Sequence, residues 1–171
     1  LTQKYEDLPK DIEWHMIGHL QSNKVKYIAP FVSLIHGVHK FKLLKEINKQ
    51  AKKEDRILDV LIQFHIAQED SKFGFDFDEA KEMLESDQFI SLENINIRGV
   101  MGMATFTDNK EQIEDEFRTL HNYFQVFKSN FFKFNDSFDI ISMGMSGDYE
   151  IAIEEGSNMI RVGSKIFGER K

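Results

Sequence analysis

The chain has 171 residues, no cysteine and a formal net charge of −7, and 41% of its residues are hydrophobic. The length predicts one domain with a real core, and the lack of cysteine excludes disulfides, a thiolate nucleophile and a cysteine zinc site. The acidic balance argues against a broad nucleic-acid surface, and no apolar run approaches the ~20 residues that span a bilayer. A cysteine-free chain without a signal peptide fits a cytoplasmic protein, which is our expectation.

Six short apolar runs predict β-strands. They cover residues 12–18, 34–38, 57–66, 96–104, 138–142 and 159–162. The third run is apolar almost throughout, which is typical of a strand covered on both faces.

Amphipathic or capped segments between these runs predict helices. They cover residues 1–8, 21–29, 39–54, a segment opening at 76–79, 109–127, 146–155 and a short turn at 164–167. Asp76 and Glu79 predict a capping box, and the lysines of residues 39–54 predict a solvated face. In residues 109–127, Ile113, Phe117, Leu120, Phe124 and Phe127 recur at helical spacing, which indicates a core face.

Strands and helices alternate without a hairpin signal between them. This order predicts parallel strands with helical crossovers, hence an α/β protein of the (β/α)8 TIM-barrel type. About six of the eight strand–helix units are visible, so the barrel is incomplete. No linker divides the chain, and we expect residues 1–171 to form a single domain.

Two clusters of small residues follow the last two predicted strands, at residues 142–148 and 156–164. Glycines and hydroxyls at helix starts are typical of phosphate sites, so Ser146, Gly163 and Ser164 are candidate anion ligands. Ser146 capping its own helix is the alternative. Arg161 lies within the second cluster, either to contact a ligand or to form a structural salt bridge. Close packing at a strand end is the simpler interpretation of Met143 beside glycine.

Histidines and one lysine supply further candidates at the ends of the first three strands. His15 and four other histidines could converge on zinc, yet no carboxylate accompanies them at a recognisable spacing, and a buried, hydrogen-bonded His15 is the expected alternative. Lys72 follows the third strand, where a desolvated lysine could form a Schiff base and a solvated lysine is the alternative.

Four blocks in order carry a resemblance to a known family. They are WHMIGHLQSNKVK at residues 14–26, EDSKFG at 69–74, SMGMSGD at 142–148 and RVGSKIFG at 161–168. With these blocks the chain resembles the YggS/PROSC family of pyridoxal phosphate (PLP) homeostasis proteins, along its whole length.

The resemblance implies a PLP-binding barrel like the N-terminal domain of alanine racemase. It implies that Ser146, Gly163 and Ser164 hold the PLP phosphate and that Arg161 faces the pyridine nitrogen. An arginine there keeps this nitrogen unprotonated and weakens PLP as an electron sink, which fits a family regarded as PLP carriers and regulators without clear turnover. Met143, His15 and Lys72 complete the candidate cofactor-binding residues.

The chain departs from the family at its N-terminal side. The family's Schiff-base lysine on the first barrel strand and the Gly-Glu-Asn block that ends the second strand are both absent. We therefore expect an N-terminally truncated barrel that binds PLP non-covalently, with Lys72 as the single substitute anchor to consider. Open barrel edges would also favour self-association.

Other functions stay open from the sequence. A PLP-dependent, racemase-like enzyme would need a Schiff-base lysine and usually a second domain. A metal-dependent barrel hydrolase would use the histidines. A remnant that binds no ligand is the last alternative.

Overall fold

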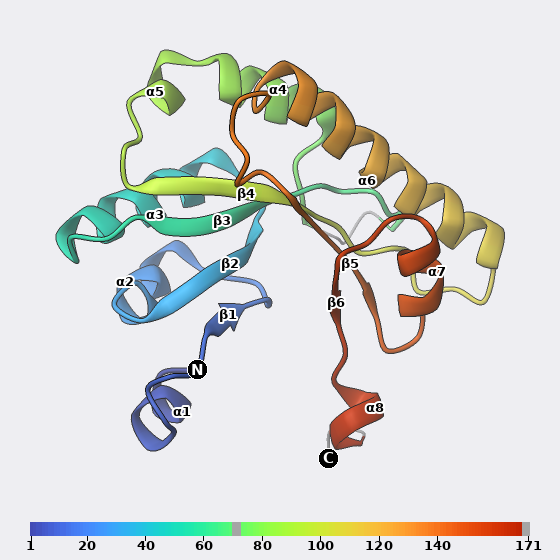
Figure 1. Cartoon of the computed structure of the whole chain (residues 1–171), viewed down its shortest axis with the longest axis horizontal. Coiled ribbons are helices and arrows are strands. Elements are labelled where there is room, and N and C mark those ends of the chain that lie inside the picture. The colour runs from blue at the N-terminus through green and yellow to red at the C-terminus, as the bar shows by residue number, and fades with distance from the viewer. Residues whose placement is uncertain (70–72, 169–171) are drawn as a thin grey trace.

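The computed structural model describes residues 1–69 and 73–168, so Lys72 lies outside the described residues. Its centre is one sheet in which every strand pairs in parallel with the next along the chain. The strands are β1 (Trp14–Met16), β2 (Val32–Val38), β3 (Leu58–Gln63), β4 (Ile95–Met101), β5 (Ile140–Met145) and β6 (Met159–Arg161). The sheet curls into an open trough, which confirms the predicted incomplete barrel (Figure 1).

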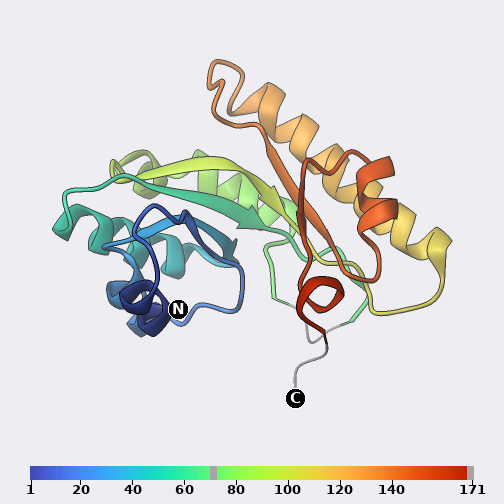
Figure 2. The ribbon, with the colours of Figure 1, turned by 60° about the horizontal axis from the view of Figure 1, so that its bottom comes forward.

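The helices lie mainly on the convex side of the sheet, as crossover connections require (Figure 1). They are α1 (Thr2–Asp7), the 3-10 turn η1 (Ser22–Lys24), α2 (Val25–Ile28), α3 (Phe41–Lys53), α4 (Phe77–Glu85), α5 (Asp87–Ile90), α6 (Lys110–Asn130), α7 (Tyr149–Glu154) and α8 (Ser164–Phe167). The first and last helices, α1 and α8, both lie on the open side of the trough (Figure 2).

The main core fills the space between the sheet and the helices. The apolar face predicted for α6 packs into this core, since Phe117, Leu120 and Phe127 are fully buried. Burying each such side chain contributes about 1.5–3 kcal/mol. On β3, Val60 belongs to this core while Leu61 belongs to a second, smaller one inside the trough, so the strand is covered on both faces as predicted.

The inner face of the trough is layered. Leu34, Leu61 and Met101 form an apolar middle layer. Polar side chains flank it at both ends of the strands, and this alternation follows from the two-residue period of strands that present every second side chain inward. The carboxyl-end layer forms the candidate site described below.

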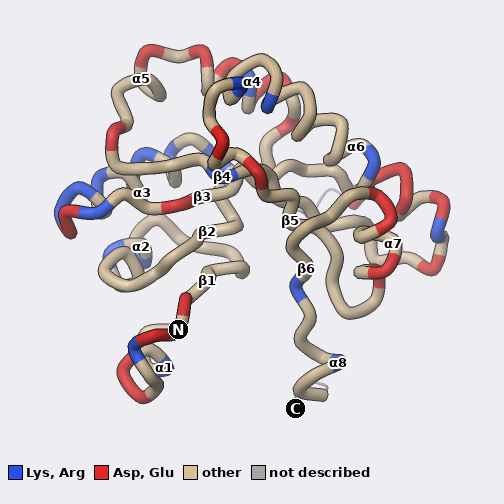
Figure 3. Tube along the Cα trace, viewed as in Figure 1, with Lys and Arg blue, Asp and Glu red and all other residues tan. Residues whose placement is uncertain are grey.

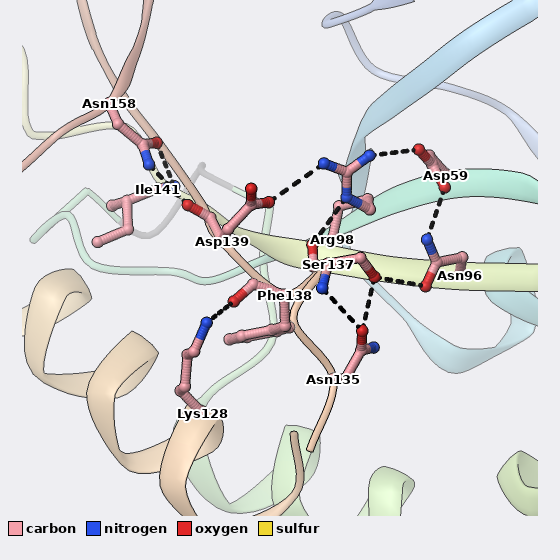
Figure 4. Close-up of polar contacts among 10 residues, drawn as sticks. All are labelled: Asp59, Asn96, Arg98, Lys128, Asn135, Ser137, Phe138, Asp139, Ile141 and Asn158. Atoms are coloured by element: carbon pink, nitrogen blue, oxygen red, sulfur yellow. Dashed lines mark hydrogen bonds and ion pairs between the residues drawn. The ribbon is translucent and has the colours of Figure 1, made fainter. Parts of the chain in front are cut away.

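The amino-end layer is an ion-pair network built on Arg98 (Figure 4). Its Nη1 lies 2.8 Å from Asp59 Oδ2, its Nη2 lies 3.2 Å from Asp139 Oδ1, and its Nε donates to the Ser137 carbonyl at 2.7 Å. Asn96 donates to the other oxygen of Asp59 at 2.8 Å. The network thereby joins β3 and β4 to the segment that precedes β5, and the two carboxylates raise the pKa of Arg98.

Local signals at helix starts agree with the structure in one case and not in another. Asp76 accepts from Glu79 N–H at 2.7 Å and Glu79 accepts from Asp76 N–H, which is the predicted capping box. The predicted cap at Ser146 is wrong, because α7 begins at Tyr149. Residues 145–148 instead form a turn, in which Asp148 Oδ1 accepts from Met145 N–H at 2.5 Å.

Charge is distributed as expected for α3. Its lysines are exposed on the side away from the sheet, and Figure 3 shows Lys and Arg gathered along this helix while acidic residues cluster around α6 and α7. The lysine run is therefore a solvated face. At the edge of the sheet, β1 is half-buried and shorter than the predicted strand at residues 12–18, and it has a partner on one side within the described chain.

Candidate functional site

An open cleft of about 720 Å³ lies where β5 and β6 end. Its floor comes from the loops after these two strands, including Ser146 and Gly163, and from Arg161 at the end of β6. His15 and His36 line it from β1 and β2. The cleft is thus at the carboxyl ends of the strands, the end at which parallel α/β barrels place their ligand sites.

One end of the cleft combines a serine hydroxyl with the backbone N–H groups of a helix start. The Gly163 N–H donates to Ser146 Oγ at 3.2 Å, which joins the loops after β5 and β6. Gly163 is the N-cap of α8 and Ser164 is its first residue, so first-turn N–H groups without intrahelical acceptors lie beside the Ser146 hydroxyl. A Cβ added at Gly147 or Gly163 would meet nothing within 4 Å, so the backbone there is accessible.

Arg161 also lines the cleft, and two uncharged groups hold its guanidinium. Its Nη1 donates to Ser142 Oγ at 2.8 Å and its Nη2 donates to the Gly102 carbonyl at 2.9 Å. Among residues 1–69 and 73–168, no ion pair within 4.0 Å joins Arg161 to a carboxylate, so the structural salt bridge considered from the sequence is not formed there. Burial lowers its pKa to about 10, which leaves the group charged at neutral pH. Asp148, which also lines the cleft, partly offsets the effect of burial on this pKa without forming an ion pair with Arg161. A buried cation that no carboxylate contacts directly favours an anionic or electron-rich ligand.

Two polar residues behind Arg161 were not identified as a pair from the sequence. Ser142 is fully buried on β5, and its Oγ lies 3.0 Å from His36 Nδ1. His36 Nε2 lies 3.1 Å from His15 Nδ1. Burial, followed by the nearby His15 and Arg161, lowers the pKa of His36 to about 3, and burial also lowers the pKa of His15. The sequence does contain a signal for such a pair, namely a polar residue inside an apolar strand. Buried polar groups need hydrogen-bond partners, so such a residue indicates a polar contact inside the sheet.

The structure brings together five of the seven candidate site residues. The cleft is lined by His15, Ser146, Arg161, Gly163 and Ser164. Met143 does not line it: the side chain is fully buried in the main core, because it alternates on β5 with the inward-facing Ser142. Lys72 lies outside the described residues.

The histidines separate into pairs and do not converge on one point. His15 contacts His36 inside the trough, whereas the His19 ring packs at a tilt against the His39 ring, with centroids 4.9 Å apart. His65 belongs to neither pair, and its Nε2 donates to the Glu69 carbonyl at 3.0 Å. Within the described part of the chain, no group of three metal-ligating side chains is placed to hold a metal ion.

Comparisons with known proteins agree with this geometry. The family model described as "Alanine racemase, N-terminal domain" matches residues 9–171. A pyridoxal phosphate homeostasis protein of Aquifex aeolicus is 39% identical over 99% of this chain and 72% of its own length. Another from Vibrio alginolyticus is 38% identical over 93% of this chain and 66% of its own length. The chain therefore spans about two thirds to three quarters of these relatives.

Solved structures give the same assignment. PipY of Synechococcus elongatus, determined with PLP bound, has a TM-score of 0.83 and 27% identity, and the match covers 98% of this chain and 75% of PipY. An alanine racemase from Clostridium difficile matches with a TM-score of 0.68 at 16% identity, which shows the shared fold alone. No helix in the described residues is both long and apolar enough for a membrane span. The chain belongs to the alanine racemase N-terminal domain family and, within it, to the pyridoxal phosphate homeostasis proteins.

Proposed function

We propose that the cleft binds PLP and that the chain carries or buffers this cofactor without catalytic turnover. The observation that carries the proposal is the Arg161 guanidinium, which lies in a cleft beside an anion-binding end and has no carboxylate within 4.0 Å among the described residues. PLP supplies both matching features, a phosphate and an electron-rich ring nitrogen.

Each end of the cleft takes one part of the cofactor. The Ser146 hydroxyl and the backbone of Gly163 and Ser164 hold the phosphate, because a helix start and adjacent glycines provide N–H donors with room for an anion. Arg161 faces the ring nitrogen and keeps it unprotonated, since two adjacent cations would repel each other. His15 lines the cleft at the side of β1. When bound, the cofactor would supply an electrophilic aldehyde, whose electron-sink character Arg161 weakens.

Binding is non-covalent in this proposal. None of the residues that line the cleft in the described structure is a lysine. Lys165, on the short helix that follows the cleft, places its Nζ 4.4 Å from the centre of the Tyr149 ring. Pyridoxal phosphate homeostasis is what the curated relatives are named for, and this supports a carrier rather than an enzyme.

Equilibrium dialysis against PLP and against pyridoxal tests the proposal. We expect saturable, stoichiometric binding of PLP and much weaker binding of pyridoxal, which lacks the phosphate. Ser146→Ala should weaken PLP binding, and the matched control Ser129→Ala, which removes an exposed hydroxyl on α6, should not. Equal affinity for PLP and pyridoxal, or no binding of either, would contradict the assignment. A covalent adduct trapped by borohydride would refute the non-covalent mode.

We also propose that the chain self-associates through its sheet edges. In the described structure β1 and β6 each pair with a single strand, so each presents a free row of backbone groups. Sedimentation velocity at increasing concentration should show a larger species, and a monomer at all concentrations would argue against this.

A further inference from the structure

Four side chains from four strands make one hydrogen-bonded line across the carboxyl-end layer of the trough. Arg161 Nη1 lies 2.8 Å from Ser142 Oγ, Ser142 Oγ lies 3.0 Å from His36 Nδ1, and His36 Nε2 lies 3.1 Å from His15 Nδ1. The line starts at β6 and ends at β1, the two edge strands of the described sheet. Ser142 and His36 are buried, so water does not replace these contacts.

The chemistry of the donors sets the direction of this line. A guanidinium can only donate, so Ser142 Oγ accepts from Arg161. The buried Ser142 hydroxyl then needs an acceptor for its own proton, and His36 Nδ1 is the acceptor that the described contacts provide. His36 therefore carries its proton on Nε2 and donates to His15 Nδ1. The reverse direction would leave a buried hydroxyl proton unpaired, which is costly.

The same arrangement requires both imidazoles to be uncharged. A protonated His36 would donate from both ring nitrogens and would add a second positive charge close to Arg161. The charged groups acting on this pair are Arg161 on His36 and Glu13 on His15, and burial is the largest influence on each ring. Burial places the pKa of His36 at about 3, so the ring is neutral across the physiological range.

We propose that Ser142 and His36 are positioning residues that, as a directed and uncharged hydrogen-bond chain ending at His15, hold the Arg161 guanidinium in its ligand-facing orientation. The Gly102 carbonyl accepts from the second terminal nitrogen of the group at 2.9 Å, so both terminal nitrogens are fixed in a side chain that lines the cleft. The proposal rests on the proposed function for the identity of the ligand, whereas the proton positions and the immobility of Arg161 do not depend on it.

The first experiment uses ¹⁵N NMR of the ligand-free protein at pH 7. We expect the Nε2 of both His36 and His15 to be protonated and both Nδ1 atoms to be bare. The Arg161 guanidinium should give separate, slowly exchanging Nη–H signals in the wild type, and Ser142→Ala should collapse them into one averaged signal. A proton on His36 Nδ1, or Arg161 signals unchanged in Ser142→Ala, would overturn the proposal even if PLP does not bind.

The second experiment measures PLP affinity in the same variants. Ser142→Ala should weaken binding about tenfold, the factor expected from losing one hydrogen bond to a charged group. The matched control is Ser157→Ala, which removes a hydroxyl bonded to the backbone of β5 without contact to Arg161 and should bind PLP normally. His36→Leu should weaken binding, and His36→Gln, whose amide both accepts and donates, should restore part of it.

The outcomes separate the two proposals. Wild-type affinity in Ser142→Ala, with PLP binding still lost in Arg161→Met, would refute the positioning role and leave the proposed function intact. Absence of PLP binding in the wild type would refute the proposed function, and the NMR signals alone would then decide the positioning role. If Ser142→Ala does not fold, the comparison of His36→Gln with His36→Leu gives the same decision.

Discussion

The buried His36 makes the stability of this protein depend on pH in a predictable direction. Burial and its neighbours lower the pKa of His36 from 6.5 to about 3 in the folded chain. Between these values the unfolded state binds a proton that the folded state does not bind. Stability therefore rises with pH in this window and is lost as the pH falls from 6.5 toward 3.

The size of the effect follows from the same shift. One pKa unit corresponds to about 1.4 kcal/mol, and pH 5 lies about 1.5 units below the ordinary pKa of histidine. Acidification from pH 8 to pH 5 should therefore cost about 2 kcal/mol through His36 alone. This is a large share of the 5–15 kcal/mol total that is typical of a native domain.

Urea unfolding at pH 8 and pH 5, followed by circular dichroism, measures this cost. We expect the wild type to lose about 2 kcal/mol more than His36→Gln between the two pH values. Ile47→Val is the matched control, since it trims a fully buried, non-titrating side chain and should cost about 1 kcal/mol equally at both pH values. An identical pH dependence in the wild type and His36→Gln would show that His36 does not titrate with a lowered pKa in the folded chain.

Three further substitutions test the framework around the site. Arg98→Ala should lower the free energy of unfolding by about 2 kcal/mol, because it removes the cation that pairs with the partly buried Asp59, and urea melts should show a much smaller change for Lys81→Ala, whose ion pair with Glu85 is exposed on both sides. Gly99→Ala should cost at least about 3 kcal/mol, because φ is +151° and the new Cβ would lie 1.9 Å from a backbone oxygen of β5, whereas Gly147→Ala meets open space. Asp76→Ala should cost about 1 kcal/mol by removing a helix cap, and an unchanged melting temperature would show that the capping box contributes nothing.

Much of the architecture could be predicted because its signals are local. The apolar runs on β2 to β4 and the helical spacing in α6 are properties of short segments, and tertiary packing agrees with them. The capping box at Asp76 is likewise complete within four residues. The last strands were harder to place: β5 extends to Met145 rather than ending at residue 142, because the small residues after it continue the pairing with β6.

The candidate site was predicted in its backbone parts and missed in its buried polar parts. Local composition was enough to predict Ser146, Gly163 and Ser164, and the structure places all three at the cleft. The partnership of Ser142 with His36 joins residues 106 positions apart and has no local signal.

Met143 was predicted as a site residue because of its position in the sequence, and the direction of its side chain was not considered. It belongs to the right segment but points to the core, because neighbouring residues on a strand face opposite sides.

We propose that PLP binds in this cleft and at no other part of the surface. Titration of the ¹⁵N-labelled protein with PLP, followed by backbone amide spectra, tests it most directly. We expect the largest shifts on the amides of Ser146, Gly163 and Ser164, with a further change at the Arg161 guanidinium. Shifts that cluster outside the cleft, or spectra that do not change at saturating PLP, would contradict it.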